Sequence, residues 1–185
     1  LIEKRLQHTY GPAIKGTYTV HGIPRDLAAA KALFNKSAFE FERWAVSMVG
    51  GQPNQKQVGD KGIDGVARFP IDAKGGLDRI LVSVKGGQTL NPAMVRDLGG
   101  TVTTQKAAMG IIVTLAPATK GFQDAIDHGG VYTHPGDGRQ FPRLQHITVS
   151  ELLRGVRPKV PRLVLPYIQA KKKVAEYDSE MLFEV

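Results

Sequence analysis

The order of segments along the chain predicts a domain of the α/β class. Helix-like stretches, in which apolar residues recur every three or four positions, alternate with short apolar runs that are typical of strands. The chain has 185 residues, of which 42% are hydrophobic and 23% charged, which suffices for one domain with a core and some extra segments. It contains no cysteine, so the fold uses neither a disulfide nor a thiolate metal site.

Three regions differ in character, and we expect the α/β domain to occupy residues 35–155. Residues 1–34 are mixed and read as a lead-in from a longer parent chain, with a β-like run at 17–20 and a short helix at 26–34. Residues 156–185 form a tail that is first basic and then acidic. No run is long and apolar enough to span a membrane, and the first residues lack a secretion signal, so we expect a cytoplasmic protein without a membrane partner.

The domain begins with a strongly predicted helix. Ser37 and Glu40 have the spacing of a capping box, with Ser37 as the N-cap. Apolar residues then recur on one helical face, and two glycines end the pattern: Phe41, Trp44, Ala45, Met48 and Val49, followed by Gly50-Gly51.

Two strands joined by a turn follow the helix. The first is expected at 62–69 and the second at 79–85, with Gly75-Gly76 in the turn between them. Residues 79–85 read Arg-Ile-Leu-Val-Ser-Val-Lys, which is apolar enough for a strand in the middle of a sheet.

The later elements continue the alternation. A helix capped by Asn91, with Pro92 in its first turn, is expected to run to about Leu98 or a little beyond. After it we expect a buried strand at 110–114, a helix at 120–127, a strand at 145–149 and a short helix that opens at Ser150.

One group of polar residues suits phosphodiester chemistry. Asp64 lies at the start of the first strand and Lys85 at the end of the second, where Ser83 shares its face because side chains alternate along a strand. A hairpin register can bring Asp64 beside Lys85, and Glu42 or Glu40 of the preceding helix can approach the same edge. Carboxylates hold Mg²⁺ (or Mn²⁺), the metal activates a water, and a lysine stabilises the charge that develops on phosphorus.

Several motifs in the same order resemble those of a known family. Phe41-Glu42-Arg43-Trp44-Ala45-Val46, Asp60-Lys61-Gly62-Ile63-Asp64-Gly65 and Val82-Ser83-Val84-Lys85-Gly86 resemble the Mrr-type restriction endonuclease domain, a branch of the PD-(D/E)xK nucleases. The later segments 95–100 and 110–114 are also similar to this family. The resemblance covers roughly residues 37–155. It implies a restriction-endonuclease-like α/β/α sandwich with a central mixed β-sheet, divalent-metal dependence and double-stranded DNA as substrate.

The resemblance also implies a role for each residue of the group. Asp64, the backbone carbonyl of Val84 and Glu42 would hold the metal, and Lys85 would stabilise the transition state. The family usually has Glu or Gln two residues before the lysine, where this chain has Ser83, and a hydroxyl is a weak ligand for Mg²⁺. Ser83 is therefore the residue of the catalytic group that departs from the pattern.

Two readings of the function follow. The first is a metal-dependent DNA endonuclease domain of a bacterial restriction-modification or DNA methyltransferase polypeptide. The wider pattern, including residues 18–24, is similar to C-terminal extensions of bacterial DNA methyltransferases, which implies a linked methyltransferase domain in the parent chain. The alternative, which Ser83 favours, is an inactive nuclease-fold module that positions such a methyltransferase on DNA; a protein-docking domain is a third, structural reading.

The charge of the chain indicates a polyanionic partner. The formal net charge is +8, and cationic side chains that neutralise phosphates release condensed counterions. We expect Arg96, Lys61, Lys171 and Lys172 to contact the DNA backbone. Cleavage of both strands would need two active sites, so a homodimer is also expected.

Overall fold

The computed structural model describes residues 2–17, 22–55 and 62–164. The β-like run at 18–20 and the predicted DNA contacts Lys61, Lys171 and Lys172 lie outside these residues. At the N-terminal side, the helix α1 (Ile2–Tyr10) contacts the short 3-10 helix η1 (Pro12–Gly16). Within the described part of the chain, no helix combines the length and the apolar character needed to cross a membrane.

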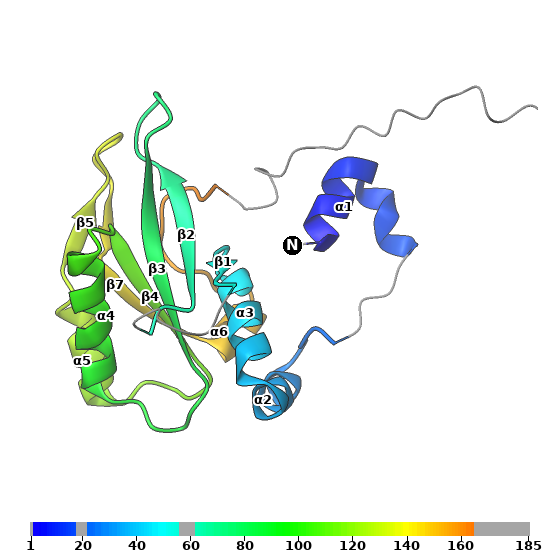
Figure 1. Cartoon of the computed structure of the whole chain (residues 1–185), viewed down its shortest axis with the longest axis horizontal. Helices are drawn as coiled ribbons and strands as arrows, with labels where there is room; N and C mark the ends of the chain where they lie inside the picture. Colours follow the sequence, from blue (N-terminus) through cyan, green and yellow to red (C-terminus); the bar gives the residue numbers. More distant parts are fainter. Residues whose placement is uncertain (1, 18–21, 56–61, 165–185) are drawn as a thin grey trace, which may run out of the picture.

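A five-stranded mixed sheet forms the centre of the domain (Figure 1). Its strands lie in the order β1-β2-β3-β4-β7, with antiparallel pairing from β1 to β3 and parallel pairing from β3 to β7. Their bounds are Gln52–Pro53 for β1, Gly65–Pro70 for β2, Leu77–Lys85 for β3, Met109–Thr114 for β4 and Leu144–Thr148 for β7. The central position predicted for the strand at 79–85 is confirmed.

Helices cover both faces of this sheet, which gives three layers (Figure 1). The helices α2 (Leu27–Lys36), α3 (Ala38–Met48) and α6 (Val149–Leu153) pack on one face. The helices α4 (Pro92–Thr104) and α5 (Lys120–Asp127) pack on the other face. The predicted α/β/α sandwich with a central mixed sheet is therefore confirmed.

Alternation along the strands explains the two hydrophobic cores. Ile80, Val82 and Val84 of β3 belong to the core beneath α3, whereas Leu81 belongs to the core beneath α4 and α5. All six residues of β4 are buried, as a central strand covered on both faces requires.

The three parallel strands end at the same side of the sheet. Lys85 of β3 is in register with Thr114 of β4, and Thr114 is in register with Thr148 of β7. We call this side the carboxyl edge. Because β3 leads into α4 and β4 leads into α5, these two helices begin near the carboxyl edge and run back across one face of the sheet.

Two local predictions are wrong in part. The helix α4 extends to Thr104, further than the expected end at Leu98 or a little beyond. Ser37 caps α3 by accepting the Glu40 N–H at 3.2 Å, but its own N–H donates to the Leu33 carbonyl at 2.8 Å. Because α2 continues to the residue before Ser37, the reciprocal half of the capping box has no free donor.

Structured chain continues beyond residue 155, where the tail was expected to begin. The side chain of Gln145, which is 9% exposed, accepts the Lys159 N–H at 2.8 Å and donates to the Lys159 carbonyl at 2.8 Å. Further along, the Val164 N–H donates to the Arg68 carbonyl at 2.8 Å, in an antiparallel bridge to β2. Residues 156–164 thus cross the α3 side of the sheet, and Val160 and Leu163 pack against its core.

A two-stranded hairpin lies between α5 and β7. It consists of β5 (Val131–Thr133) and β6 (Gln140–Pro142). Tyr132 packs edge-on against Phe69 of β2, with ring centroids 5.8 Å apart, and the His134 Nε2 lies 2.9 Å from the Pro70 carbonyl oxygen. The hairpin is therefore attached to the end of β2 that is distant from Asp64.

Candidate functional site at the carboxyl edge

Asp64 is held at the start of β2 by backbone bonds on both sides. Its N–H donates to the Val82 carbonyl at 2.8 Å, and its carbonyl accepts the Asn54 N–H at 3.0 Å. The carboxylate oxygen Oδ2 accepts the Val84 N–H at 2.6 Å. The side chain of Asp64 therefore reaches across to β3, one residue before Lys85.

The backbone of β3 presents two neighbouring residues to opposite sides. The Lys85 carbonyl accepts the Leu115 N–H at 3.2 Å, so Lys85 pairs toward β4. The Val84 N–H points the other way, toward Asp64, and the carbonyl of a strand residue lies on the same side as its N–H. The Val84 carbonyl thus lies on the Asp64 side of β3, where the resemblance places a metal-binding carbonyl.

Glu42 of α3 lies within electrostatic range of both Asp64 and Lys85. Burial raises the pKa of the half-buried Glu42 carboxyl, the Asp64 carboxylate raises it further, and the Lys85 ammonium lowers it. Two carboxylates and one lysine, from a helix and two strands, therefore influence one another at this edge. Glu40 does not share this position: its carboxylate pairs with Arg43, 3.4 Å away on the exposed side of α3.

Ser83 has a structural partner. Its side chain is buried, with the residue 3% exposed, and its hydroxyl donates to the Gly62 carbonyl at 2.8 Å. Gly62 has a φ of 74°, a backbone conformation that favours glycine, at the turn that leads into Asp64. The Ser83 hydroxyl thus fixes the loop that carries Asp64, at the position where the family usually has a Glu or Gln.

These residues do not make a complete site for Mg²⁺ or Mn²⁺. Among the described residues there is no group of three or more His, Cys, Asp or Glu that could hold a metal ion. Asp64 and Glu42 are two carboxylates, one oxygen of Asp64 already accepts an N–H, and the Ser83 hydroxyl is committed to Gly62. A hard divalent cation needs about six oxygen ligands, and protein carboxylates supply its charge balance.

Asn54 is a positioning residue that the sequence did not reveal. Its side-chain Nδ2 donates to the Ile63 carbonyl at 2.6 Å, and its N–H donates to the Asp64 carbonyl. Asn54 directly follows β1, in a polar segment for which no helix or strand was predicted. An asparagine in a polar loop is common, so no signal in the sequence separates this residue from its neighbours.

A second polar group lies along the same edge, toward β7. The Thr114 hydroxyl donates to the Ala116 carbonyl at 2.6 Å, so the His146 Nε2, 2.8 Å from that hydroxyl oxygen, must donate to it. Burial lowers the pKa of His146, and the nearby Glu151 carboxylate raises it. Glu151 is in turn held by the Thr148 N–H and hydroxyl, in the capping box that begins α6.

The predicted DNA contacts are not gathered at this site. Arg96 lies on the exposed face of α4, in a groove between α4 and α5. Lys61, Lys171 and Lys172 belong to the residues that the structure does not describe. Only Asp64, Lys85, Glu42, Ser83 and Val84 can therefore be placed at the carboxyl edge.

Comparison with known families identifies the domain. A family model described as NACHT-associated inactive Restriction Endonuclease 1 matches residues 37–154, which is more than half of the chain. The chain belongs to this inactive restriction endonuclease family. The restriction-endonuclease-like character predicted from the motifs is thereby confirmed, and the matched range lies within one or two residues of the predicted domain.

A solved structure is similar to the chain at a lower level. It is described as the MspJI restriction endonuclease in complex with a 27-mer oligonucleotide, with 15% sequence identity and a TM-score of 0.47. The alignment covers 69% of this chain and 29% of that protein, so the chain spans less than a third of its length. No curated protein matches the chain.

Proposed function

We propose that this domain binds double-stranded DNA through a restriction-endonuclease fold that has lost the ability to cleave it. One observation carries the proposal: the Ser83 hydroxyl donates to the Gly62 carbonyl at the position where a metal-binding nuclease of this kind needs a further acidic or amide ligand. A metal that lacks this ligand would not be retained long enough to activate a water. The inactive character of the family supports the same conclusion.

The charges at the carboxyl edge support DNA as the partner. Lys85 ends β3, and the exposed Lys120 begins α5. The N-termini of α4 and α5 also lie near this edge. The Asn91 side chain caps α4 by accepting the Met94 N–H, and the Thr119 side chain caps α5 by accepting the Phe122 N–H. Helix N-termini carry partial positive charge and, together with lysines, favour phosphate groups.

Metal-dependent DNA cleavage is the second candidate. The observation in its favour is that Asp64, Glu42 and Lys85 remain together although Ser83 differs from the family pattern. In that case Asp64, Glu42 and the Val84 carbonyl would bind Mg²⁺ or Mn²⁺ weakly. A linked DNA methyltransferase, a homodimer and a cytoplasmic location remain predictions made from the sequence.

Two measurements on the full chain separate these functions. The first is the affinity for a fluorescent DNA duplex over a range of salt concentrations, and the second is nicking of a supercoiled plasmid with Mg²⁺ or Mn²⁺. We expect salt-dependent binding without nicking. Lys85→Ala and Lys120→Ala should each reduce the slope of log affinity against log salt by about 0.9, the value for one phosphate contact. Lys74→Ala, in the turn between β2 and β3, is the matched control and should leave the slope unchanged.

The alternative outcomes are equally clear. Nicking that requires a divalent metal and disappears in Asp64→Asn would establish the endonuclease and overturn the inactive reading. An affinity for DNA that is absent, or that does not change with salt, would show that the domain uses a protein partner instead.

A further inference from the structure

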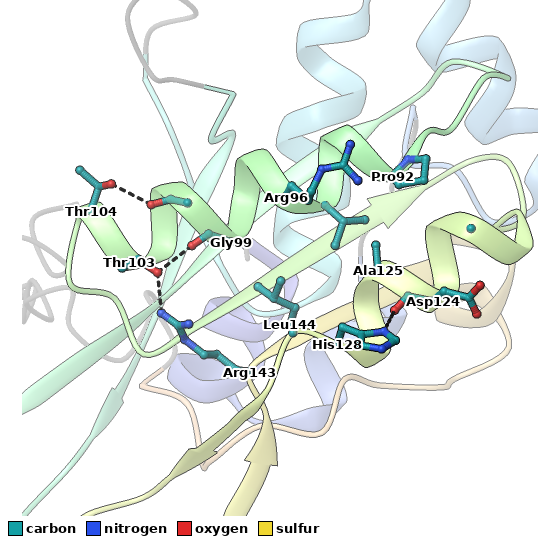
Figure 2. Close-up of a pocket in the computed structure, with 14 residues that line it drawn as sticks. Pro92, Arg96, Gly99, Thr103, Thr104, Asp124, Ala125, His128, Arg143 and Leu144 are labelled. Carbon is teal, nitrogen blue, oxygen red and sulfur yellow. Dashed lines mark hydrogen bonds between the residues drawn. The ribbon is translucent and has the colours of Figure 1, made fainter.

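A groove runs between α4 and α5 on the face of the domain that is remote from α3. Its volume is about 880 Å³, and small residues of both helices form much of its walls, including Gly99, Gly121 and Ala125 (Figure 2). The side chains of Val95 and Leu144 lie at its base and are buried in the core beneath α4 and α5. The groove therefore combines an apolar floor with walls that lack large side chains.

Cationic groups predominate among the charged residues that line this groove. Arg96 is exposed on α4 and has no acidic partner within the part of the chain that the structure describes, and the Arg143 Nη2 donates to the Thr103 hydroxyl at 2.9 Å (Figure 2). The His128 Nδ1 lies 2.6 Å from the Asp124 carbonyl, and Asp124 is the acidic residue of the lining. Arg96 and Thr103 are seven residues apart on α4, so the two arginines mark sites about 10 Å apart along the helix.

We propose that this groove binds the acidic segment of the same chain, residues 176–185. The segment contains no lysine or arginine, and three of its acidic residues recur every four positions: Glu176, Glu180 and Glu184. An apolar series with the same spacing lies beside them: Tyr177, Met181 and Val185. On an α-helix these two series form adjacent stripes, one to pair with Arg96 and Arg143 and one to cover the apolar floor.

The point at which the described chain ends places the segment within reach. Val164 is bonded to Arg68 of β2, and Arg68 is paired with Arg79 of β3. The Arg79 guanidinium donates to the carbonyl of Gln105. Gln105 is the residue directly after α4, and Thr103 and Thr104 before it line the groove. Val164 therefore lies toward the same end of the strands as the Thr104 end of the groove. The eleven residues 165–175 can span up to about 40 Å.

The absence of cysteine from the chain allows a direct test by cross-linking. Thr104→Cys places a thiol in the exposed wall of the groove, and Ser179→Cys places the second thiol in the acidic segment. Lys74→Cys with Ser179→Cys is the matched control, because Lys74 is exposed in the turn after β2 and also lies on the Val164 side of the sheet. With a short bismaleimide, we expect the groove pair to cross-link within one molecule about tenfold faster than the control pair.

Charge exchange makes the test specific for the proposed contact. Arg96→Glu with Arg143→Glu should reduce the cross-linking rate to that of the control pair. Glu176→Arg, Glu180→Arg and Glu184→Arg added to that variant should restore it. Thermal melts of each variant establish that the domain is folded.

Three results would overturn the proposal. The first is equal rates for the groove pair and the control pair. The second is a product that joins two molecules, which would assign the groove to a second copy of the chain. The third is a rate that Arg96→Glu with Arg143→Glu leaves unchanged while DNA affinity falls, which would assign these arginines to DNA.

Discussion

At the scale of single residues, Ser83 decides what the carboxyl edge can bind. Its hydroxyl stabilises the Gly62 turn, which in turn positions Asp64 against the Val84 N–H. A serine here gives the loop a fixed geometry but contributes no negative charge. The negative charge of the site therefore rests on Asp64 and Glu42, and Lys85 opposes it.

Substitution of this serine should change the metal affinity of the domain. We expect Ser83→Glu to gain a site for Mn²⁺, because a third carboxylate would join Asp64 and Glu42. Addition of Mn²⁺ should then stabilise the folded variant by about 2.7 kcal/mol when the free ion is at a hundredfold excess over Kd. This stabilisation should appear as a rise in Tm. Ser83→Leu, whose side chain offers no ligand atom, is the control, and it should show no such rise; melts in EDTA report the folding of both variants.

The partly buried His146 gives the stability of the domain a pH dependence. Burial lowers the pKa of His146 below its ordinary value of 6.5, so the unfolded chain binds the proton more tightly than the folded domain. The stability that the neutral ring contributes is present above pH 6.5 and is lost as the pH falls through the folded-state pKa. We expect His146→Gln to remove this part of the pH dependence in urea titrations between about pH 7 and pH 5, and an unchanged profile would contradict the assignment.

At the scale of elements, a glycine allows β2 to pass between a strand and a helix. A Cβ on Gly65 would meet the side chain of Val46 in α3 and would lie 2.8 Å from the Gln52 carbonyl oxygen of β1. The packing of α3 and β1 therefore restricts position 65 to a residue without a side chain. No side chain can occupy this position unless α3 or β1 moves.

Alanine substitutions at two glycines test this constraint. We expect Gly65→Ala to lower the free energy of unfolding by about 1–3 kcal/mol, because the added methyl group overpacks a site that the backbone of β1 closes. Gly87→Ala, which meets no atom within 4 Å, should change the stability by less than about 0.5 kcal/mol. Urea unfolding of both variants gives the comparison, and equal effects would show that β1 yields easily.

The sequence predicted those elements whose pattern is local. Four elements could be predicted from their apolar residues alone: the helices α3 and α5 and the strands β3 and β4. In each of them, most of the buried positions are occupied by apolar residues at the spacing that the element requires. The end of α4 was not predictable in this way. Gly99 and Gly100 are poor helix formers, but Val102 is fully buried and packs close to Gly110 of β4, so tertiary contact continues the helix.

The sequence named Asp64, Lys85 and Glu42 of the candidate site, but it did not reveal Asn54 or the hydrogen bonds that hold the site together. The positions of Asp64 and Lys85 on consecutive strands followed from the hairpin pattern. The bond from Ser83 to Gly62 joins residues 21 positions apart, and the bond from Asn54 to Ile63 connects a loop to the strand entry. Neither bond has a periodic signal in the sequence, because both depend on how the turn before Asp64 folds over β3.

At the scale of the whole molecule, Gln145 attaches the segment 156–164 to the sheet. Its side-chain amide exchanges two hydrogen bonds with the backbone of Lys159 and also donates to the Pro142 carbonyl at 3.2 Å. A buried amide with this many partners acts as a clamp between β7 and a distant part of the chain. Its removal leaves backbone groups without partners.

Loss of this clamp should expose the segment to proteolysis. We expect Gln145→Leu to lower the free energy of unfolding by about 1–3 kcal/mol and to accelerate tryptic cleavage after Lys159 and Arg162. Gln123→Leu is the matched control, because Gln123 is exposed on α5 and its side chain donates to the neighbouring Asp127. Cleavage rates that are the same in the two variants would show that the core contacts of the segment hold it without Gln145.

The bridge between Val164 and Arg68 has a consequence for self-association. Among the residues that the structure describes, β1 pairs with β2 only at Gly65 and Val66, so the remainder of β2 would form an open border of the sheet if residues 156–164 were missing. Unsatisfied amide and carbonyl groups along such a border recruit strands from other molecules, which leads to aggregation. A version of the domain shortened before residue 156 would therefore be prone to precipitate, and the last described stretch of chain protects the solubility of the fold.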